Sequence, residues 1–190
     1  MELLLIRHAR PVRAEVEHGP ADPVLSELGH AQARALALWL ADEQIDAIYV
    51  SPMRRARETA APLEVALGMV ATVDEGIAEY DRESSEYIPV EELRAEGDER
   101  WKQLPEDPDT FQQGVVDAID RIIERHPSQR VALVCHGGVI NVYCARIVQS
   151  PLTMFFLPGY TSISRVFAAS SGERSIHSLN ETAHLRTITG

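Results

Sequence analysis

Short apolar runs alternate along the chain with longer stretches in which apolar residues recur every three or four positions. The apolar runs cover residues 2–6, 47–50 and 131–135, and a weaker run covers 70–73. Runs of this length that end at polar or turn residues predict buried strands. The longer stretches predict amphipathic helices, because 3.6 residues per turn place positions three and four apart on one face.

The helical stretches carry local start and stop signals. Ser26 suits an N-cap, Pro52 suits the first helical turn, and Gly68 suits a helix stop. We therefore expect helices over 26–43, 51–67, 111–125 and 139–148, with a short helical pattern near 90–101 between two prolines, Pro89 and Pro105.

The C-terminal region alternates apolar and polar residues instead of showing helical spacing. Its apolar positions predict two edge strands around 163–167 and 176–179, joined by a turn at Ser171 and Gly172. Strands that alternate with helices over the rest of the chain predict an α/β fold. We expect a three-layer α/β/α sandwich with a mostly parallel sheet, helices on both faces and an antiparallel edge strand. A chain of 190 residues fits a single domain, residues 1–190.

The net charge narrows the range of partners. It is −11, so nucleic acid and anionic membrane surfaces are unfavourable partners, because binding them needs positive charge. The apolar stretches are too short to span a membrane, and the N-terminus enters a strand without a basic targeting region, so we expect a cytoplasmic protein. Cys135 and Cys144 have apolar neighbours and are expected to be buried thiols. No oligomeric state is predicted.

Acidic residues concentrate in one segment. Residues 79–109 contain twelve Asp or Glu against four Lys or Arg. This composition predicts a solvated surface excursion, an acidic lid or insertion at about 81–110. We expect it to line the entrance of a site together with residues 10–20, where its charge would disfavour polyanionic substrates.

Two histidines directly follow the strongest apolar runs. Arg7 and His8 follow the run at 2–6. His136 follows the run at 131–135, with Gly137 and Gly138 after it. Ligands of open α/β sheets bind beyond the carboxyl ends of the strands, so both imidazoles are expected there. An imidazole can attack phosphorus, and a guanidinium fits phosphate oxygens. The two glycines fit either a close backbone approach to an anion or a tight turn with positive φ. The pattern indicates an anion site that contains a nucleophile.

A basic segment follows the second apolar run. Residues 51–60 contain Arg54, Arg55 and Arg57 at the start of an expected helix, where free backbone N–H groups attract anions. Neighbouring helical residues differ by about 100° in direction, so at most one or two of these arginines reach one site. We expect Arg54 and Arg57 to be solvated.

A carboxyl group after the weak apolar run at 70–73 could act as a proton donor. Glu79 has the best position for this role, and Asp81 and Glu83 compete with it. The histidines form no H-x-x-x-H or H-E-x-x-H pattern, and the chain lacks phosphate-binding glycine loops and a G-x-S-x-G elbow. We therefore expect no metal site and no nucleotide cofactor.

These segments resemble the motifs of the histidine phosphatase superfamily, the phosphoglycerate mutase-like proteins, and of its small bacterial phosphatase branch. Residues 5–9 are similar to the N-terminal motif, 51–60 to the second motif, 134–138 to the second-histidine motif, and 180–185 to the tails of small bacterial members. The motifs stand in family order from residue 2 to about 185. Ala9 replaces the usual glycine, and the segment after Glu79 lacks the family's usual glycine-rich sequence.

The resemblance implies a histidine phosphatase-like domain that hydrolyses small phosphomonoesters through a phosphohistidine, without metal or other cofactor. The implied catalytic residues are His8, Arg7, Arg55, His136 and Glu79, and the implied phosphate-binding residues are Arg7, Arg55, His136 and Gly137. Asp81 is the alternative proton donor.

Three other activities are compatible with the same motifs: phosphoglycerate mutase-type transfer, dephosphorylation of protein phosphohistidine, and silent binding of a phosphorylated ligand. A mutase needs a closed, water-poor site, usually supplied by longer insertions and a longer tail, so the compact chain favours hydrolysis. A silent binding protein would keep the arginines but lose a histidine or the acid. Measured turnover separates the enzymatic activities from silent binding.

Overall fold

The computed structural model describes residues 1–99 and 107–188, and its centre is a six-stranded sheet in the order β4-β3-β6-β1-β7-β8. Its strands are β1 (Glu2–Arg7), β3 (Ala47–Val50), β4 (Thr72–Val73), β6 (Arg130–Cys135), β7 (Ile163–Ala168) and β8 (Arg174–Glu181). β4, β3, β6 and β1 run parallel, and β7 is antiparallel to both β1 and β8. The prediction of a mostly parallel sheet is confirmed.

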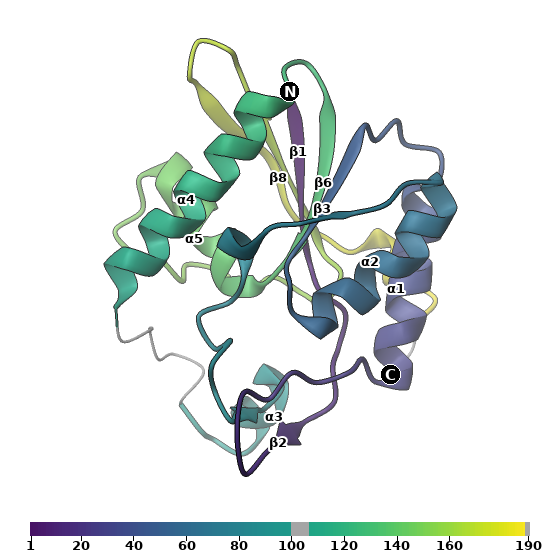
Figure 1. Ribbon diagram of the computed structural model, residues 1–190, viewed down its shortest axis with the longest axis vertical. Helices are drawn as coiled ribbons and strands as arrows, with labels where there is room; N and C mark the ends of the chain where they lie inside the picture. Colours follow the sequence, from purple (N-terminus) through teal and green to yellow (C-terminus); the bar gives the residue numbers. More distant parts are fainter. Residues whose placement is uncertain (100–106, 189–190) are drawn as a thin grey trace.

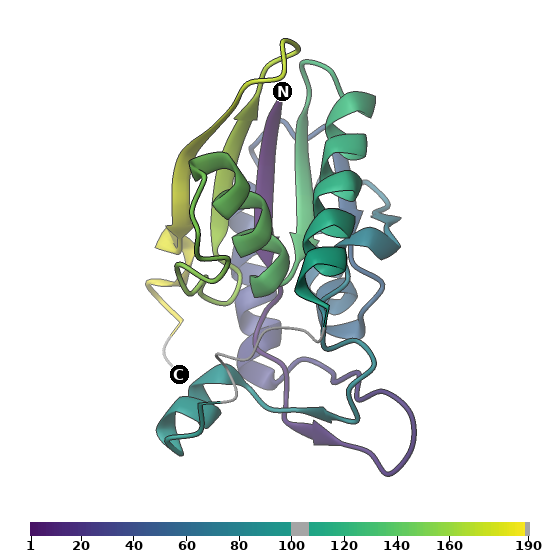
Figure 2. The same ribbon diagram turned by 90° about the vertical axis from the view of Figure 1, so that its left-hand side faces the viewer.

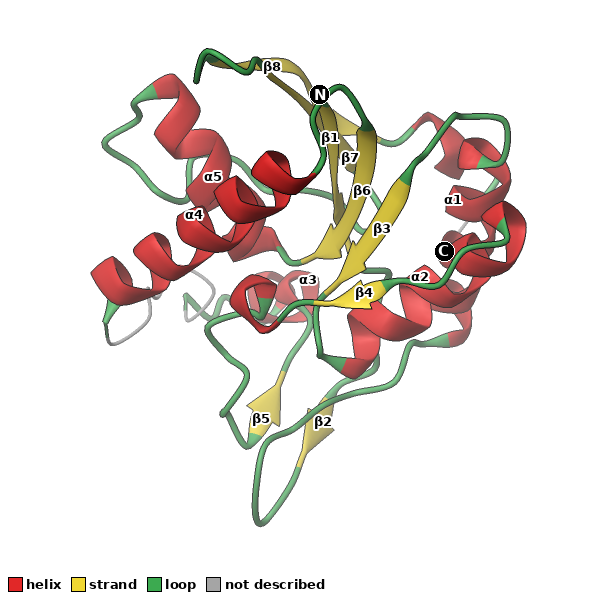
Figure 3. Cartoon of the chain, turned by 45° about the horizontal axis from the view of Figure 1, so that its top comes forward, coloured by secondary structure: helices red, strands yellow, loops and turns green. Residues whose placement is uncertain are grey.

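Helices cover both faces of the sheet, which confirms the three-layer sandwich (Figures 1 and 3). On one face α1 (Glu27–Leu40) packs against α2 (Arg54–Leu67), and on the other α4 (Pro108–Arg125) packs against α5 (Gly137–Val148). Among the described residues, no helix is long and apolar enough to cross a membrane.

Alternation along the central strands divides the interior into two cores. In β1, Leu3 and Leu5 join the core beneath α4 and α5, whereas Leu4 and Ile6 join the core beneath α1 and α2. All four side chains are inaccessible to solvent. A strand that is buried on both faces is apolar at every position, which explains why β1 and β6 stand out as continuous apolar runs in the sequence. Cys135 and Cys144 are both buried and unpaired, as expected.

The start of α2 differs from the prediction. Helical geometry begins at Arg54, and Pro52 lies before the helix rather than in its first turn. The Arg54 backbone N–H donates to both carboxylate oxygens of Asp22, at 2.9 and 3.0 Å. A side chain from a distant loop therefore occupies the anion-attracting helix start that the sequence suggested for a ligand. Gly68 ends the helix with a left-handed backbone, as predicted.

The other helix boundaries follow their local caps. Ser26 caps α1 by accepting from the Gly29 N–H, as predicted, and the helix ends at Leu40. α4 begins before the predicted start because the Asp107 carboxylate accepts from the Thr110 N–H at 3.1 Å. α5 begins directly after His136. The short pattern after Pro89 forms α3 (Val90–Ala95), which ends before the predicted 101; the last predicted residues, 100 and 101, lie outside the described residues.

The two C-terminal strands form as predicted around a turn in which Gly172 has a positive φ of 105°. Of these two strands, β8 alone lies at an edge of the sheet. β7 lies between β1 and β8, so the expectation of two edge strands is wrong for β7. Its alternation reflects a mixture of buried residues and the exposed Phe167 rather than an edge position.

A small cap, formed by residues 10–25 and 81–97, lies beyond the carboxyl ends of the central strands (Figure 2). In it β2 (Ala14–Glu15) pairs antiparallel with β5 (Glu86–Tyr87), and α3 follows β5. Arg10 forms an ion pair with Glu91 at 3.1 Å, which joins the two cap segments. The two-residue strands of the cap are too short to produce a periodic pattern, so their pairing is not predictable from the sequence.

Candidate active site

The two strand-end histidines meet in space. Because β1 and β6 pair in parallel with Arg7 opposite Cys135, the next residue of each strand, His8 and His136, emerges at the same place. The ring centroids lie 5.1 Å apart, and both side chains are almost completely buried. Residues 128 positions apart therefore share one site.

The ring of His8 is held by its own backbone neighbourhood. Its Nδ1 lies 2.8 Å from the Ala9 carbonyl oxygen, which can only accept, so Nδ1 carries the proton and Nε2 keeps its lone pair. The Ala9 N–H donates to the Thr59 hydroxyl on α2 at 2.8 Å. Burial lowers the pKa of His8 well below its usual range, and the neighbouring charges of Arg55 and Arg7 lower it further. His8 is thus a neutral imidazole with a free Nε2 at neutral pH.

The backbone after His8 is supported by the C-terminal part of the chain. The Thr161 N–H donates to the carbonyl oxygens of Arg7 and His8, at 3.0 and 3.3 Å. The Thr161 hydroxyl in turn lies 3.0 Å from Nε2 of His184 in the tail segment. Thr161 has a positive φ of 54°, an uncommon conformation for a β-branched residue that is held here by these contacts.

The ring of His136 is oriented by Ser51, the residue that follows β3. Nε2 of His136 lies 2.7 Å from the Ser51 hydroxyl, which itself accepts from the Met53 N–H at 3.3 Å. With the Met53 N–H bonded to the hydroxyl oxygen, the Ser51 O–H is available to donate to Nε2, and we assign the proton of the neutral ring to Nδ1 on this basis. Burial, followed by the charge of Arg55, lowers the pKa of His136 well below its usual range.

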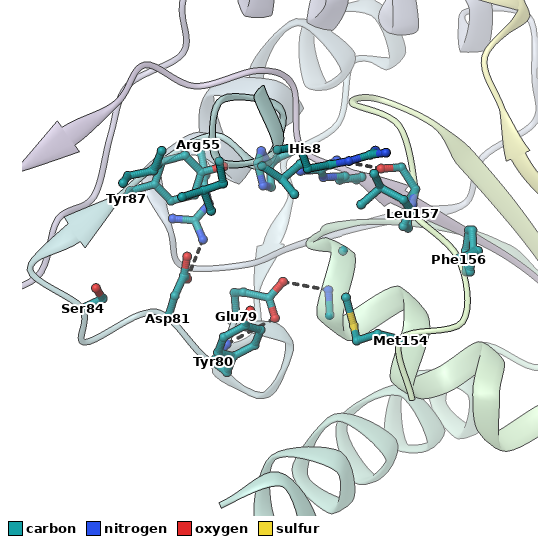
Figure 4. A pocket seen from close by; sticks show the side chains of 18 of the residues that line it. His8, Arg55, Glu79, Tyr80, Asp81, Ser84, Tyr87, Met154, Phe156 and Leu157 are labelled. Carbon is teal, nitrogen blue, oxygen red and sulfur yellow. Dashed lines mark hydrogen bonds and ion pairs between the residues drawn. The ribbon is translucent and has the colours of Figure 1, made fainter. Parts of the chain in front are cut away.

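Two buried guanidinium groups stand beside these rings. Arg7 donates from Nη1 to the Pro158 carbonyl oxygen at 2.7 Å, and its Cζ lies 4.1 Å from the centroid of the Tyr160 ring. Arg55 is 1 % exposed and its Cζ lies 4.6 Å from the centroid of the Tyr87 ring. Figure 4 shows the Arg55 side chain directed toward the cavity. As predicted, Arg54 and Arg57 of the same segment are exposed.

Several buried nitrogen atoms of this cluster have no protein partner. They are Nε of Arg7, Nε and Nη1 of Arg55, and Nδ1 of His136. Buried donors without a partner are costly, and such atoms call for a functional explanation. Their convergence around His8 fits an anion with several acceptor oxygens, such as a phosphoryl group.

Glu79 contacts the opposite side of the same cavity. Its Oε2 accepts from the Gly138 N–H at 2.8 Å and its Oε1 from the Tyr80 N–H at 3.2 Å. Burial, together with the charge of Asp81, raises the pKa of Glu79 to about 7. A carboxyl group with this pKa is able to donate and accept a proton near neutral pH.

The position of Glu79 explains why residue 138 is a glycine. A Cβ on Gly138 would overlap the Glu79 carboxylate, so only glycine allows this approach. Neither Gly137 nor Gly138 has a positive φ, so the tight-turn explanation of these glycines is wrong. Their close-approach explanation holds for Gly138, where a protein carboxylate makes the approach.

Asp81 and Glu83 have different positions from Glu79. The Asp81 carboxylate accepts from Arg55 Nη2 at 2.7 Å, so it is an ion-pair partner of a buried guanidinium (Figure 4). Glu83 is exposed and forms an ion pair with Arg82 at 3.2 Å.

Of these residues, Arg7, His8, Arg55, Glu79 and Asp81 line one end of a cavity of about 720 Å³. His136 is fully buried next to His8 and is not among the lining residues. The cap contributes to the lining through residues 81–94, as predicted. No residue of 10–20 is among its described lining residues, so that part of the entrance prediction is wrong. Residues 154–158 also line the cavity, a role that was not predicted for them. They carry no motif. The Pro158 carbonyl oxygen accepts from Arg7, and Asn141 on α5 donates to the carbonyl oxygens of both Phe156 and Gly137, which connects the loop to the predicted site.

Metal ligands are not grouped in the described part of the chain, where no three His, Cys, Asp or Glu side chains converge as a metal site requires. The polar atoms of the cavity instead form the set of anion donors around His8 described above.

Comparison with known proteins shows what this site belongs to. Residues 3–182 match the histidine phosphatase superfamily (branch 1). Phosphoserine phosphatase 1 of Hydrogenobacter thermophilus is 30% identical over 97% of this chain and 94% of its own length. A mycobacterial glucosyl-3-phosphoglycerate phosphatase shares the fold with a TM-score of 0.74 at 23% identity, covering 96% of this chain and 99% of that one.

A further solved structure with the same fold is a histidine-to-alanine variant of phosphoserine phosphatase from Entamoeba histolytica in complex with phosphoserine. It has a TM-score of 0.74 at 23% identity and covers 97% of this chain and 98% of that one. The match of the family profile over nearly the whole chain extends the resemblance of the motifs to the complete domain. The chain belongs to the histidine phosphatase superfamily.

Proposed function

We propose that this protein is a metal-independent phosphomonoester hydrolase in which His8 forms a phosphohistidine. Family membership and phosphatase-named relatives support a phosphoric monoester hydrolase. The observation that carries the finer proposal is the free Nε2 of His8 among converging buried donors without partners. We extend the proposal to one catalytic domain over residues 1–190, with the acidic segment at about 81–110 as its lid.

In the first step His8 Nε2 attacks phosphorus in line with the leaving alcohol. The N–P bond forms as the P–O bond to the alcohol breaks, and Glu79 donates its proton to the departing oxygen. Charge on the phosphoryl oxygens is stabilised by donors from Arg7, Arg55 and His136. The Gly137 backbone, in the first turn of α5, adds the favourable end of a helix.

In the second step water attacks phosphorus and breaks the N–P bond. The ionised Glu79 accepts the proton of the water, which restores the starting protonation states of Glu79 and His8. A pKa of about 7 suits one group to both steps, because each form is populated near neutral pH. The ion pair with Arg55 gives Asp81 a positioning role.

Access of water favours hydrolysis over mutase-type transfer. Met154 and Leu157 at the rim of the cavity are 38 % and 40 % exposed, so the described lining is open to solvent at this side. A mutase has to keep its phosphohistidine from water while the alcohol exchanges. We therefore propose that water is the ordinary acceptor and that a small phosphorylated molecule is the ordinary substrate, in a cytoplasmic setting.

The test is turnover of phenyl phosphate by the purified protein, measured with and without a chelator. We expect the chelator to leave the rate unchanged, and His8→Ala to abolish turnover while His177→Ala, a change of an exposed histidine on β8, does not. A phosphoryl label trapped on the wild-type protein should be acid-labile and base-stable. Near wild-type activity of His8→Ala would refute the proposal, and absence of turnover in the wild type would favour a silent binding protein.

A further inference from the structure

We propose that the physiological leaving group is an apolar alcohol, aliphatic or aromatic, rather than a small charged alcohol such as serine or glycerate. This inference rests on the proposed hydrolase function and concerns the part of the cavity beyond the phosphate-binding end. It is carried by the chemistry of the walls, the exposure of the rim and the charges around it.

The walls beyond the phosphate-binding end are predominantly apolar. Two segments form them, the β5–α3 part of the cap and the loop after α5. From these segments and Tyr80 come the following lining residues: Tyr80, Tyr87, Ile88, Val90, Leu93, Met154, Phe155, Phe156 and Leu157. Ligand sites of this kind bind the body of a molecule through apolar contacts and orient it through a few polar groups at one end.

The apolar surface continues to the mouth of the cavity and is accessible to solvent there. Tyr80, Met154 and Leu157 are each close to two-fifths exposed. Figure 4 shows Met154 and Leu157 on the same side of the cavity as Phe156, facing the cap residue Tyr87 across it. A substrate with an apolar body would remove this exposed surface from water, whereas a serine or glycerate group would leave it exposed.

The charges beyond the phosphate-binding end disfavour a second anionic group on the substrate. Glu86 lines the cavity with a carboxylate, and Asp81 lines it as well, in its ion pair with Arg55. Outside the two phosphate-binding arginines, Arg94 is the one basic residue among the described lining residues, and it lies exposed on α3. A carboxylate on the leaving group would approach acidic side chains without a buried cation to bind it.

The volume also exceeds what a minimal substrate needs. A cavity of about 720 Å³ falls in the range that accommodates a drug-sized ligand, much larger than a phosphoryl group with a three-carbon alcohol. The inference is therefore specific about size as well as polarity: the alcohol should carry a ring or a chain of several carbons.

The experiment compares esters of unactivated primary alcohols, so that leaving-group reactivity does not decide the result. The series is propyl, hexyl and 2-phenylethyl phosphate, with phosphoserine and 3-phosphoglycerate as charged members. We expect kcat/KM to rise by about tenfold or more from propyl to hexyl, since each fully buried methylene contributes roughly a fourfold gain. Hexyl and 2-phenylethyl phosphate should exceed phosphoserine and 3-phosphoglycerate by at least about tenfold on the same grounds.

A pair of variants locates the effect. Met154→Asn places a neutral polar group in the rim and should reduce the hexyl-to-propyl ratio by several-fold. Leu152→Asn is the matched control, because Leu152 is 65 % exposed in the same loop but is not among the lining residues. It should leave the ratio unchanged.

The outcomes separate the inference from the function on which it rests. A flat chain-length series, or phosphoserine turned over as well as the hexyl ester, overturns the inference while hydrolysis itself stands. An equal effect of both variants on the ratio would also contradict it. If no ester is hydrolysed, including phenyl phosphate, the proposed function fails and this inference fails with it. The series on the wild-type protein decides the matter even where a variant does not fold.

Discussion

The phosphate-binding end of the cavity and its outer walls are built in different ways. The inner end is formed by residues at the ends of β1, β3 and β6 and on α2, nearly all of them buried and hydrogen-bonded to the central fold. The outer walls come from the cap and the 154–158 loop, which offer apolar and partly exposed side chains. The central sheet provides the precision that catalysis needs, whereas loops adapt the site to the alcohol.

Electrostatics follow the same division. At the inner end burial shifts the pKa values of His8, His136 and Glu79 away from their usual ranges, and Arg55 is buried against Asp81. In the cap the ion pairs are solvated. The Arg13 side chain is 47 % exposed, and its Nη2 and Nη1 lie 3.8 Å from Glu86 Oε1 and 3.7 Å from Glu96 Oε1. We therefore expect changes at the inner end to act on chemistry and changes in the cap to act weakly on stability.

Apart from loss of the nucleophile in His8→Ala, the largest effect should come from Glu79→Gln. Loss of the proton donor should reduce kcat/KM for an alkyl phosphate by about 10³-fold, within the usual range for general acid catalysis. The loss should be much smaller for p-nitrophenyl phosphate, whose leaving group needs little protonation. Steady-state kinetics with the two substrates provide the measurement, and equal losses on both would assign Glu79 a structural role only.

The pH profile gives a second reading of the same variant. The pKa of Glu79 is raised to about 7, so the protonated form that donates to the leaving group predominates below that pH and is lost above it. For the wild type kcat/KM on an alkyl phosphate should fall about tenfold per pH unit above 7, and this limb should disappear in Glu79→Gln. Ionisation of the substrate affects the wild type and the variant equally, so it cancels in the ratio of their kcat/KM values at each pH. A limb that persists in the variant would belong to another group.

Arg55→Lys should reduce kcat/KM by about 10²-fold on all substrates alike. An ammonium cannot reproduce the contact with Asp81 and the two free donors of the guanidinium at the same time. Arg57→Lys, a change of an exposed arginine on the same helix, is the matched control. Kinetics with alkyl and aryl phosphates measure the effect, and a loss confined to one substrate would place Arg55 with the outer walls instead.

Gly138→Ala should reduce kcat/KM on alkyl phosphates by about tenfold or more, again within the range of general acid catalysis. The added Cβ overlaps the Glu79 carboxylate and has to displace it. Gly114→Ala on α4 is the control, because no atom lies within 4 Å of the added Cβ there. Thermal unfolding of both variants checks that the fold persists. An unaltered rate would mean that Glu79 moves without consequence for catalysis.

The smallest effect should come from Arg13→Ala in the cap. Its two ion pairs are exposed, so we expect a loss of less than about 1 kcal/mol in the free energy of unfolding and little change in turnover of phenyl phosphate. Denaturant unfolding and steady-state assays provide the two measurements. A loss comparable to that of Arg55→Lys would show that the cap is part of the rigid frame, which would remove the contrast between the two regions.

Much of the inner end could be predicted because its signals are local. Strands that are buried on both faces appear in the sequence as uninterrupted apolar runs. The residue after each run lies at the carboxyl end of its strand, as His8 and His136 show. Helical spacing brings Arg55 onto the buried face with Ala56 and Thr59. The start of α2 could not be predicted in the same way, because its cap, Asp22, comes from a loop 32 residues earlier.

The sequence by itself determined the three-layer architecture, the two strand-end histidines and the choice of Arg55, because periodicity and motif are properties of neighbouring residues. Only the tertiary structure decided that the Glu79 carboxylate accepts from the Gly138 N–H and that Asp81 pairs with Arg55. It also decided that the loop at 154–158, which carries no sequence motif, forms part of the outer wall. Those contacts join segments whose separation along the chain leaves no periodic trace, and they depend on how loops close over a finished sheet. The pKa values that suit the site to its chemistry arise from that closure, because burial is a property of the assembled fold.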